Sequence, residues 1–64
     1  MQQTDLHPQQ RIQPIGGGCI RIVLAVRDIR PLAIGWGIAC RYENAPNSRN
    51  FLTSIELQGY EVLD

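Results

Sequence analysis

Residues 32–42, LAIGWGIACRY, alternate large apolar side chains with small ones. Successive side chains of a β-strand point to opposite faces, so this alternation predicts a strand with one bulky face and one nearly bare face. The bulky row consists of Leu32, Ile34, Trp36, Ile38, Cys40 and Tyr42, and the bare row of Ala33, Gly35, Gly37 and Ala39. A bare strand face allows a ligand, another backbone or a second copy of the protein to approach closely. The stretch therefore predicts both a fold class and a candidate surface.

Alternating patterns also occur on both sides of this stretch. Residues 19–26 alternate and are rich in β-branched side chains, which favours a strand over a helix. We expect Ile20, Ile22, Leu24 and Val26 to form its apolar row, on the same face as the bulky row of residues 32–42. Residues 28–31 end in a proline, which cannot donate to a strand ladder, and so predict a hairpin connection. Residues 51–57 alternate again and predict a third strand, with Phe51 in its apolar row.

Turn-forming residues separate these segments. The polar stretch 43–50 contains proline, asparagine and serine, and predicts a longer exposed loop. Gly59 interrupts the third strand as a bulge or tight turn, after which residues 60–63 continue that strand or form a short fourth one. We therefore expect an all-β chain, a small antiparallel meander of three or four strands. It would close as an SH3-like barrel or be completed by oligomerisation.

The first 18 residues differ in composition from the rest. They hold five glutamines, two prolines and a triple glycine, with few apolar residues. Such a segment buries too little surface to offset its ordering entropy. We expect a disordered tail over residues 1–18, with the glycines as a hinge, and a β domain over residues 19–64. The single histidine, His7, lies in this tail, where we expect it to be solvated.

The size and composition of the chain limit its function. A 64-residue chain forms one domain, and a core of this size supplies roughly 3–5 kcal/mol. Cys19 and Cys40 have no neighbouring ligands for zinc, and we expect both thiols to stay reduced in a cytoplasmic protein. No signal peptide or membrane span is visible, and the lone histidine supports no catalytic triad. We expect a non-enzymatic protein without cofactor or metal.

The two predicted faces suggest two functions. The apolar rows of the three strands together exceed what a lone sheet can leave in water. We therefore favour a small interaction module or accessory subunit that binds another protein or itself. Trp36, Tyr42 and Phe51 would be its core or interface anchors.

The opposite face carries arginines around the small residues. All six basic residues are arginine and the net charge is zero. Arginine suits phosphates and carboxylates. The alternative function is therefore a nucleic-acid or nucleotide-binding regulatory module. Its candidate residues are Arg21, Arg27, Arg41 and Arg49. A simpler alternative is that these arginines only solubilise an outer face.

The C-terminal half also shows a family pattern. Pro31 precedes the strand that contains Ile34-Gly35-Trp36, and Arg49-Asn50-Phe51, Ile55 and Glu61-Val62-Leu63-Asp64 follow in order. Over residues 30–64 this order resembles the end of a WYL domain, although the tryptophan-tyrosine-leucine triplet of that family is absent. The resemblance implies a small Sm/SH3-like fold that senses nucleic acids or nucleotides, with Arg41 and Arg49 facing the ligand.

Overall fold

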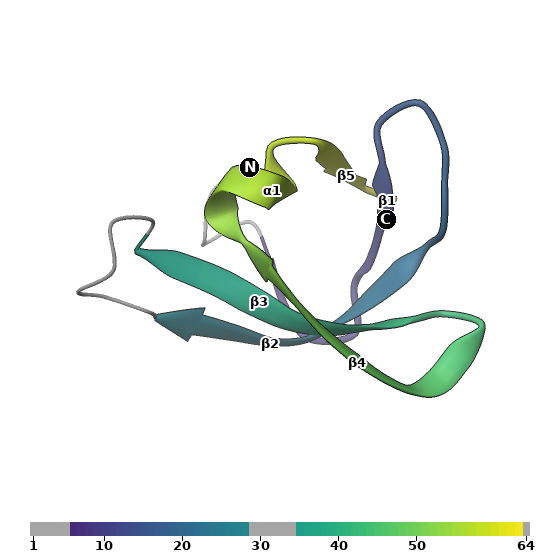
Figure 1. Cartoon of the computed structure of the whole chain (residues 1–64), viewed down its shortest axis with the longest axis horizontal. Helices are drawn as coiled ribbons and strands as arrows, with labels where there is room; N and C mark the ends of the chain where they lie inside the picture. Colours follow the sequence, from purple (N-terminus) through teal and green to yellow (C-terminus); the bar gives the residue numbers. More distant parts are fainter. Residues whose placement is uncertain (1–5, 29–34, 64) are drawn as a thin grey trace.

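The computed structural model describes residues 6–28 and 35–63 of the chain (Figure 1). The elements are β1 (Arg11–Pro14), β2 (Arg21–Asp28), β3 (Trp36–Tyr42), β4 (Ala45–Thr53), α1 (Ser54–Leu57) and β5 (Tyr60–Val62). The strands form one five-stranded antiparallel sheet in the order β4-β3-β2-β1-β5. The predicted all-β class and antiparallel meander are therefore confirmed.

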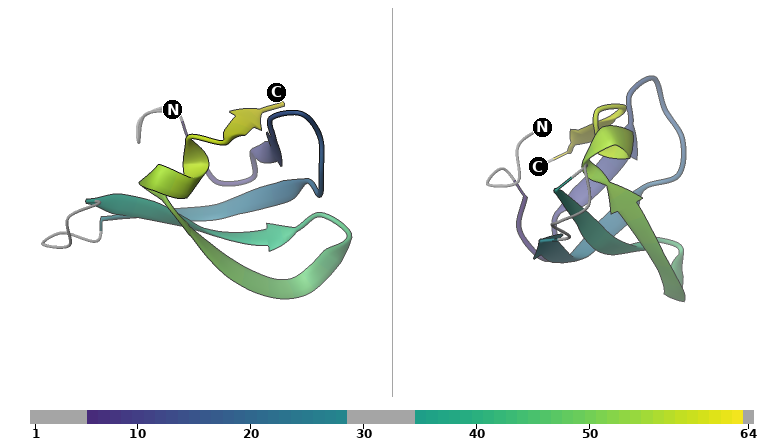
Figure 2. Two further views of the ribbon diagram at one scale, coloured as in Figure 1. Left: turned by 45° about the horizontal axis from the view of Figure 1, so that its top comes forward. Right: turned by 60° about the vertical axis from the view of Figure 1, so that its left-hand side comes forward.

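The sheet is bent so that its two ends face each other. Strands β2, β3 and β4 form a curved layer, and β1, α1 and β5 lie on one side of it (Figures 1 and 2). We call the side of β2–β4 that faces α1 and β5 the inner face, and the opposite side the outer face. The core lies on the inner face and consists of Leu6, Ile12, Val23, Ile38, Cys40, Leu52 and Leu57. The inner face is thus covered by the chain's own elements.

Strand β3 shows the predicted alternation. Ile38 and Cys40 are fully buried on the inner face, and Trp36 packs against the core from the strand end. Gly37 and Ala39 occupy the outer face. The first residues of the predicted strand, 32–34, and the adjoining part of the predicted hairpin connection lie outside the described residues.

Strand β2 departs from the predicted single apolar row. Its pairing with β3 shifts between Val23 and Ala25, so that one extra residue bulges out of the ladder. Val23 and Val26 consequently both point inward, opposite Cys40 and Ile38. The prediction that residues 20, 22, 24 and 26 share the core face is wrong, because the bulge reverses the alternation midway along the strand.

Strand β4 replaces the predicted loop. Only Glu43 and Asn44 form the turn after β3, and the strand begins at Ala45 despite Pro46. A proline is tolerated there because β4 is an edge strand of the sheet. The register also reverses the predicted faces of this segment, because Leu52 pairs with Ile38 inside and Phe51 with Ala39 outside.

The predicted third strand ends early, at Thr53. The Thr53 side chain accepts from the backbone N–H of Glu56, and the Glu56 carboxylate accepts from the backbone N–H of Thr53. This capping box starts the helical turn α1, whose Leu57 is fully buried in the core. Residues 58–59 then form the predicted turn, and Tyr60–Val62 is the short additional strand.

The described part of the N-terminal segment is not a tail. Ile12 of β1 is fully buried between β2 and β5, and Leu6 belongs to the core. The N–H of Gln9 donates to the carbonyl of Val23 at 2.7 Å, and the N–H of Val23 donates to that of Gln10 at 2.9 Å. The prediction of disorder here is wrong because few apolar residues suffice when each one completes an existing core. The triple glycine, with positive φ throughout, forms the connection from β1 to β2.

A candidate binding surface on the outer face

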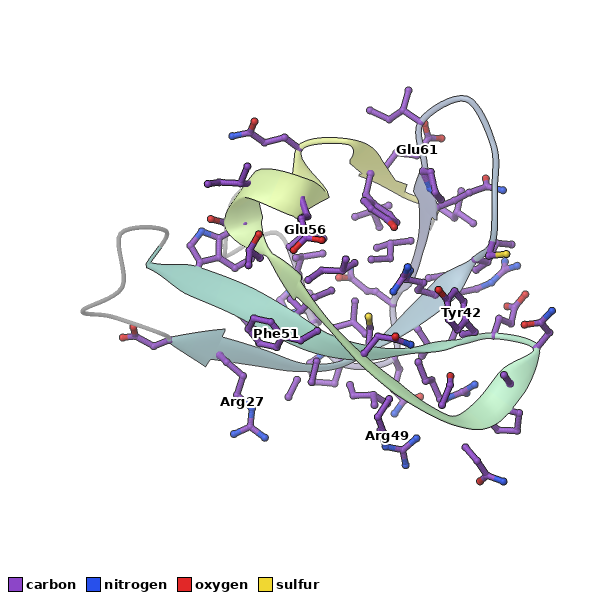
Figure 3. All side chains as sticks on the ribbon, viewed as in Figure 1. Arg27, Tyr42, Arg49, Phe51, Glu56 and Glu61 are labelled. Carbon is purple, nitrogen blue, oxygen red and sulfur yellow. The ribbon has the colours of Figure 1, made fainter. Side chains whose placement is uncertain are left out.

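The outer face of β3 is covered in part by the chain's own phenylalanine. The Phe51 ring lies over Gly37, where a Cβ atom would be 2.5 Å from the ring Cζ and 2.7 Å from the carbonyl oxygen of Leu52. Real Cβ atoms essentially never approach so closely, so the ring occupies space that only glycine leaves free. Phe51 nevertheless remains 46% exposed, and its ring projects across β3 (Figure 3).

Three arginines lie around this ring on the same face. Arg27 pairs with Gly37, and Arg41 lies two residues beyond Ala39, the partner of Phe51. Arg49 precedes Phe51 by two residues on β4, so strand alternation places both on one face. Figure 3 shows Arg27 and Arg49 extending away from the core. We refer to Arg27, Arg41, Arg49 and Phe51 as the arginine–phenylalanine surface.

Hydrogen bonds to the backbone hold two of these arginines in place. The Nη1 of Arg49 donates to the carbonyl oxygens of Pro46 at 3.1 Å and Ser48 at 2.7 Å. The Nη1 of Arg41 donates to the carbonyl oxygen of Tyr42 at 3.2 Å. These bonds orient the guanidinium groups without neutralising their charge.

The carboxylates of the described residues have other partners or positions. Glu43 forms an ion pair with Arg11, with 2.7 Å between Oε2 and Nε, and Arg11 shares the cross-strand row of Ile22 and Arg41. Glu56 caps α1, Glu61 lies on β5, and Asp28 projects from the opposite side of β2 to Arg27. A chain of zero net charge therefore presents a locally cationic surface around an exposed aromatic ring.

Arg21 has a different environment from the other candidate arginines. It pairs with Tyr42 on the inner face, so the prediction that it shares a face with Arg27 and Arg41 is wrong. Its Nη2 donates to the Tyr42 hydroxyl at 3.0 Å, and its Cζ lies 4.5 Å from the centroid of that ring and 5.8 Å from that of Tyr60. Arg21 thus links β2, β3 and β5 by cation–π contacts.

The surroundings of Arg21 favour its charged form. Burial lowers the pKa of the guanidinium, but the hydrogen bond to the Cys40 sulfur and the electrostatic influence of Tyr60, Tyr42 and Cys40 outweigh it. The pKa is therefore raised above its ordinary value. Arginine is protonated throughout the accessible pH range in any case, so this side chain is a permanent cation within the fold.

The three aromatic anchors predicted from the sequence do not form one patch. Trp36 packs against the core, Tyr42 is half-buried beneath Arg21, and Phe51 lies on the outer face. The position of the Phe51 ring over Gly37 could not be predicted from the sequence, because the expected register placed the ring on the inner face. A Thr-x-x-Glu pattern at residues 53–56 was the available signal, since a capping box there ends the strand at Thr53.

Other features of the described residues are weaker candidates for a site. A shallow hollow of about 220 Å³ is lined by Gly18, Cys19, Ile20, Glu43 and Asn44, and its one carboxylate is already paired with Arg11. The described residues contain no group of three or more histidine, cysteine or acidic side chains that could hold a metal ion. Within the same residues, no helix is long and apolar enough to cross a membrane.

Comparison with known proteins gives no further lead. No family model matches the chain, and neither a curated protein nor a solved structure is detectably similar to it. The resemblance of residues 30–64 to a WYL domain stays a prediction.

Proposed function

We propose that the chain is a small non-enzymatic binding module that recognises an anionic partner through the arginine–phenylalanine surface. The observation that carries this proposal is the separation of charge. Arg27, Arg41 and Arg49 surround an exposed ring, whereas Glu43 is already paired with Arg11 and Glu56 caps α1. Guanidinium groups bind phosphates and carboxylates through paired N–H donors, which is the chemistry such a surface offers.

The strand order supports the proposal of an SH3-like barrel. Strand β5 returns beside β1, and a helical turn joins β4 to β5. Folds of this type host many unrelated functions, so the fold does not indicate the function and only the surface does. Because β1, α1 and β5 cover the inner face, its apolar side chains do not require a second copy of the chain to cover them.

The test is binding to an immobilised polyanion such as heparin at increasing salt. Retention at low salt that falls steeply as salt rises is expected for contacts that release counterions. The double variant Arg27→Gln/Arg49→Gln should lose retention while keeping its circular dichroism spectrum. The matched control is Ile15→Glu/Ile55→Glu, which changes net charge equally at two exposed positions off the surface. Equal losses in both variants would contradict the proposal.

A second candidate is a protein partner or a second copy of the chain. It is supported by β4, a nine-residue edge strand that, among the described strands, pairs with β3 alone. Free strand edges accept an added strand through backbone hydrogen bonds. A solution mass measured by light scattering tests self-association: a defined oligomer that persists at high salt favours a second copy as the partner, and a monomer removes that partner and leaves a different protein.

A further inference from the structure

Phe51 is an unusual residue for a purely electrostatic surface. Of the four aromatic side chains, it alone is exposed, whereas Trp36, Tyr42 and Tyr60 are half-buried against the core or Arg21. An anionic peptide would require the arginines but not the ring. An exposed aromatic ring between cations is the arrangement that binds unpaired nucleobases, because every base has a π-face that stacks.

The arginines lie on two sides of the ring. Arg49 is two residues before Phe51, roughly 6.5 Å away along β4. Arg27 lies on the neighbouring strand β2, in the cross-strand row of Gly37, over which the ring lies. A chain of phosphates that passes over the ring would therefore meet a guanidinium before and after it.

Arg49 is also preorganised for such a contact. Its Nη1 is engaged by the two loop carbonyls of Pro46 and Ser48. Within the described part of the chain, its Nε and Nη2 have no such partner, and these two donors form a fork that fits a phosphate.

We propose that the anionic partner is a single-stranded nucleic acid, with one base stacked on Phe51 and the flanking phosphates bound by Arg49 and Arg27. This inference rests on the proposed function and specifies its ligand class. Gly37 is a positioning residue for the site, because it provides the space in which the Phe51 ring lies. A duplex is a poorer ligand, since its bases are already stacked on one another.

The experiment measures binding by fluorescence anisotropy. The probes are a labelled oligothymidine of twelve nucleotides and its duplex with oligodeoxyadenosine, and unlabelled heparin is the competitor. Phe51→Ala should weaken binding of the single strand by about tenfold or more, the usual effect of removing a stacking platform. Phe51→Trp should bind as well as the wild type. The oligonucleotide should also quench the tryptophan fluorescence of this variant more than that of the wild type, whose fluorescence comes from Trp36 alone. Ile55→Ala removes a comparably exposed apolar side chain from α1 and is the matched control.

The outcomes separate the two proposals. Preference for the single strand, lost in Phe51→Ala and regained in Phe51→Trp, supports base stacking. Salt-dependent binding of single strand, duplex and heparin alike, unchanged by Phe51→Ala, overturns stacking but keeps the anion-binding function. Absence of binding to all three probes at low salt overturns both. Thermal unfolding followed by circular dichroism confirms that each variant is folded.

Discussion

The inner and outer faces of β2–β4 are built from alternate residues of the same three strands, yet they have opposite character. The inner face holds fully buried side chains such as Val23 and Ile38, covered by β1, α1 and β5. The outer face holds arginines, a partly exposed phenylalanine and the glycine beneath it. Arg21 and Arg27 illustrate the difference, because one strand presents the first to two tyrosines and the second to solvent. The face on which a residue lies, rather than its type, decides its role.

Removing volume from the inner face should have the largest effect. Ile38→Ala is expected to cost about 2–5 kcal/mol, since Ile38 is fully buried at the centre of the core. A domain of this size has roughly 3–5 kcal/mol in total, so we expect the variant to be unfolded at room temperature. Circular dichroism measures this directly. Ile55→Ala, at an isoleucine that is 59% exposed, should remain folded. If both variants melted alike, the assignment of the inner face would be wrong.

Adding one methyl group to the outer face should have the next largest effect. Gly37→Ala places a Cβ against the Phe51 ring and the carbonyl oxygen of Leu52, and is expected to destabilise the fold by about 1–3 kcal/mol. Phe51→Ala in the same chain should recover part of this loss, because it removes one of the two close contacts. Chemical denaturation of the single and double variants measures the coupling. Strict additivity would show that the ring does not occupy the space above Gly37.

The two arginines of β2 allow the inner and outer faces to be compared with one residue type on one strand. Arg21→Gln should cost about 1–2 kcal/mol, because it removes the cation–π contacts and the hydrogen bond to the Tyr42 hydroxyl. Arg27→Gln should leave the unfolding free energy almost unchanged. Urea denaturation of both variants tests this difference. Equal costs would indicate that Arg27 also stabilises the fold.

The smallest effect is expected at the ion pair between Arg11 and Glu43. Both side chains are about two-fifths exposed, and such pairs contribute about 0–1 kcal/mol. Glu43→Gln should therefore lower the unfolding free energy by less than about 1 kcal/mol, and the difference should shrink at high salt. A thermal melt at low and at high ionic strength measures both. A large, salt-independent loss would point to a role of Glu43 beyond this pair.

The parts of this fold that were predictable from sequence are those with uninterrupted alternation. Strand β3 is such a case, because no residue between Trp36 and Tyr42 breaks the pattern. The bulge in β2 was not predictable, since alternation carries no mark of an extra residue until the partner register is known. The bulge moved Arg21 away from the candidate site. The outer position of Phe51 was not predictable for a related reason. Either register of its strand buries an apolar side chain, Phe51 or Leu52, so the sequence does not decide between them.

Strand β1 was not predicted because it is stabilised by contacts with other strands and not by its own residues. Only Ile12 of its four residues is buried, so composition alone predicts a disordered segment. The strand is held by β2 on one side and β5 on the other, and neither contact can be inferred from residues 11–14 themselves.

The pairing of β1 with β5 also has a consequence for how the chain acquires its structure. Ile12 pairs with Val62, and the N–H of Leu63 donates to the carbonyl oxygen of Arg11 at 2.9 Å, so the two ends of the domain close on each other. Contacts with such large sequence separation form late, because the loop between them must first be ordered. During synthesis on the ribosome, the hairpins of β2–β4 can assemble as they emerge, but Ile12 gains its second neighbour only after Val62 has left the exit tunnel. Until then, one side of β1 is an unpaired strand edge, and that interval is when the nascent chain is most exposed to aggregation.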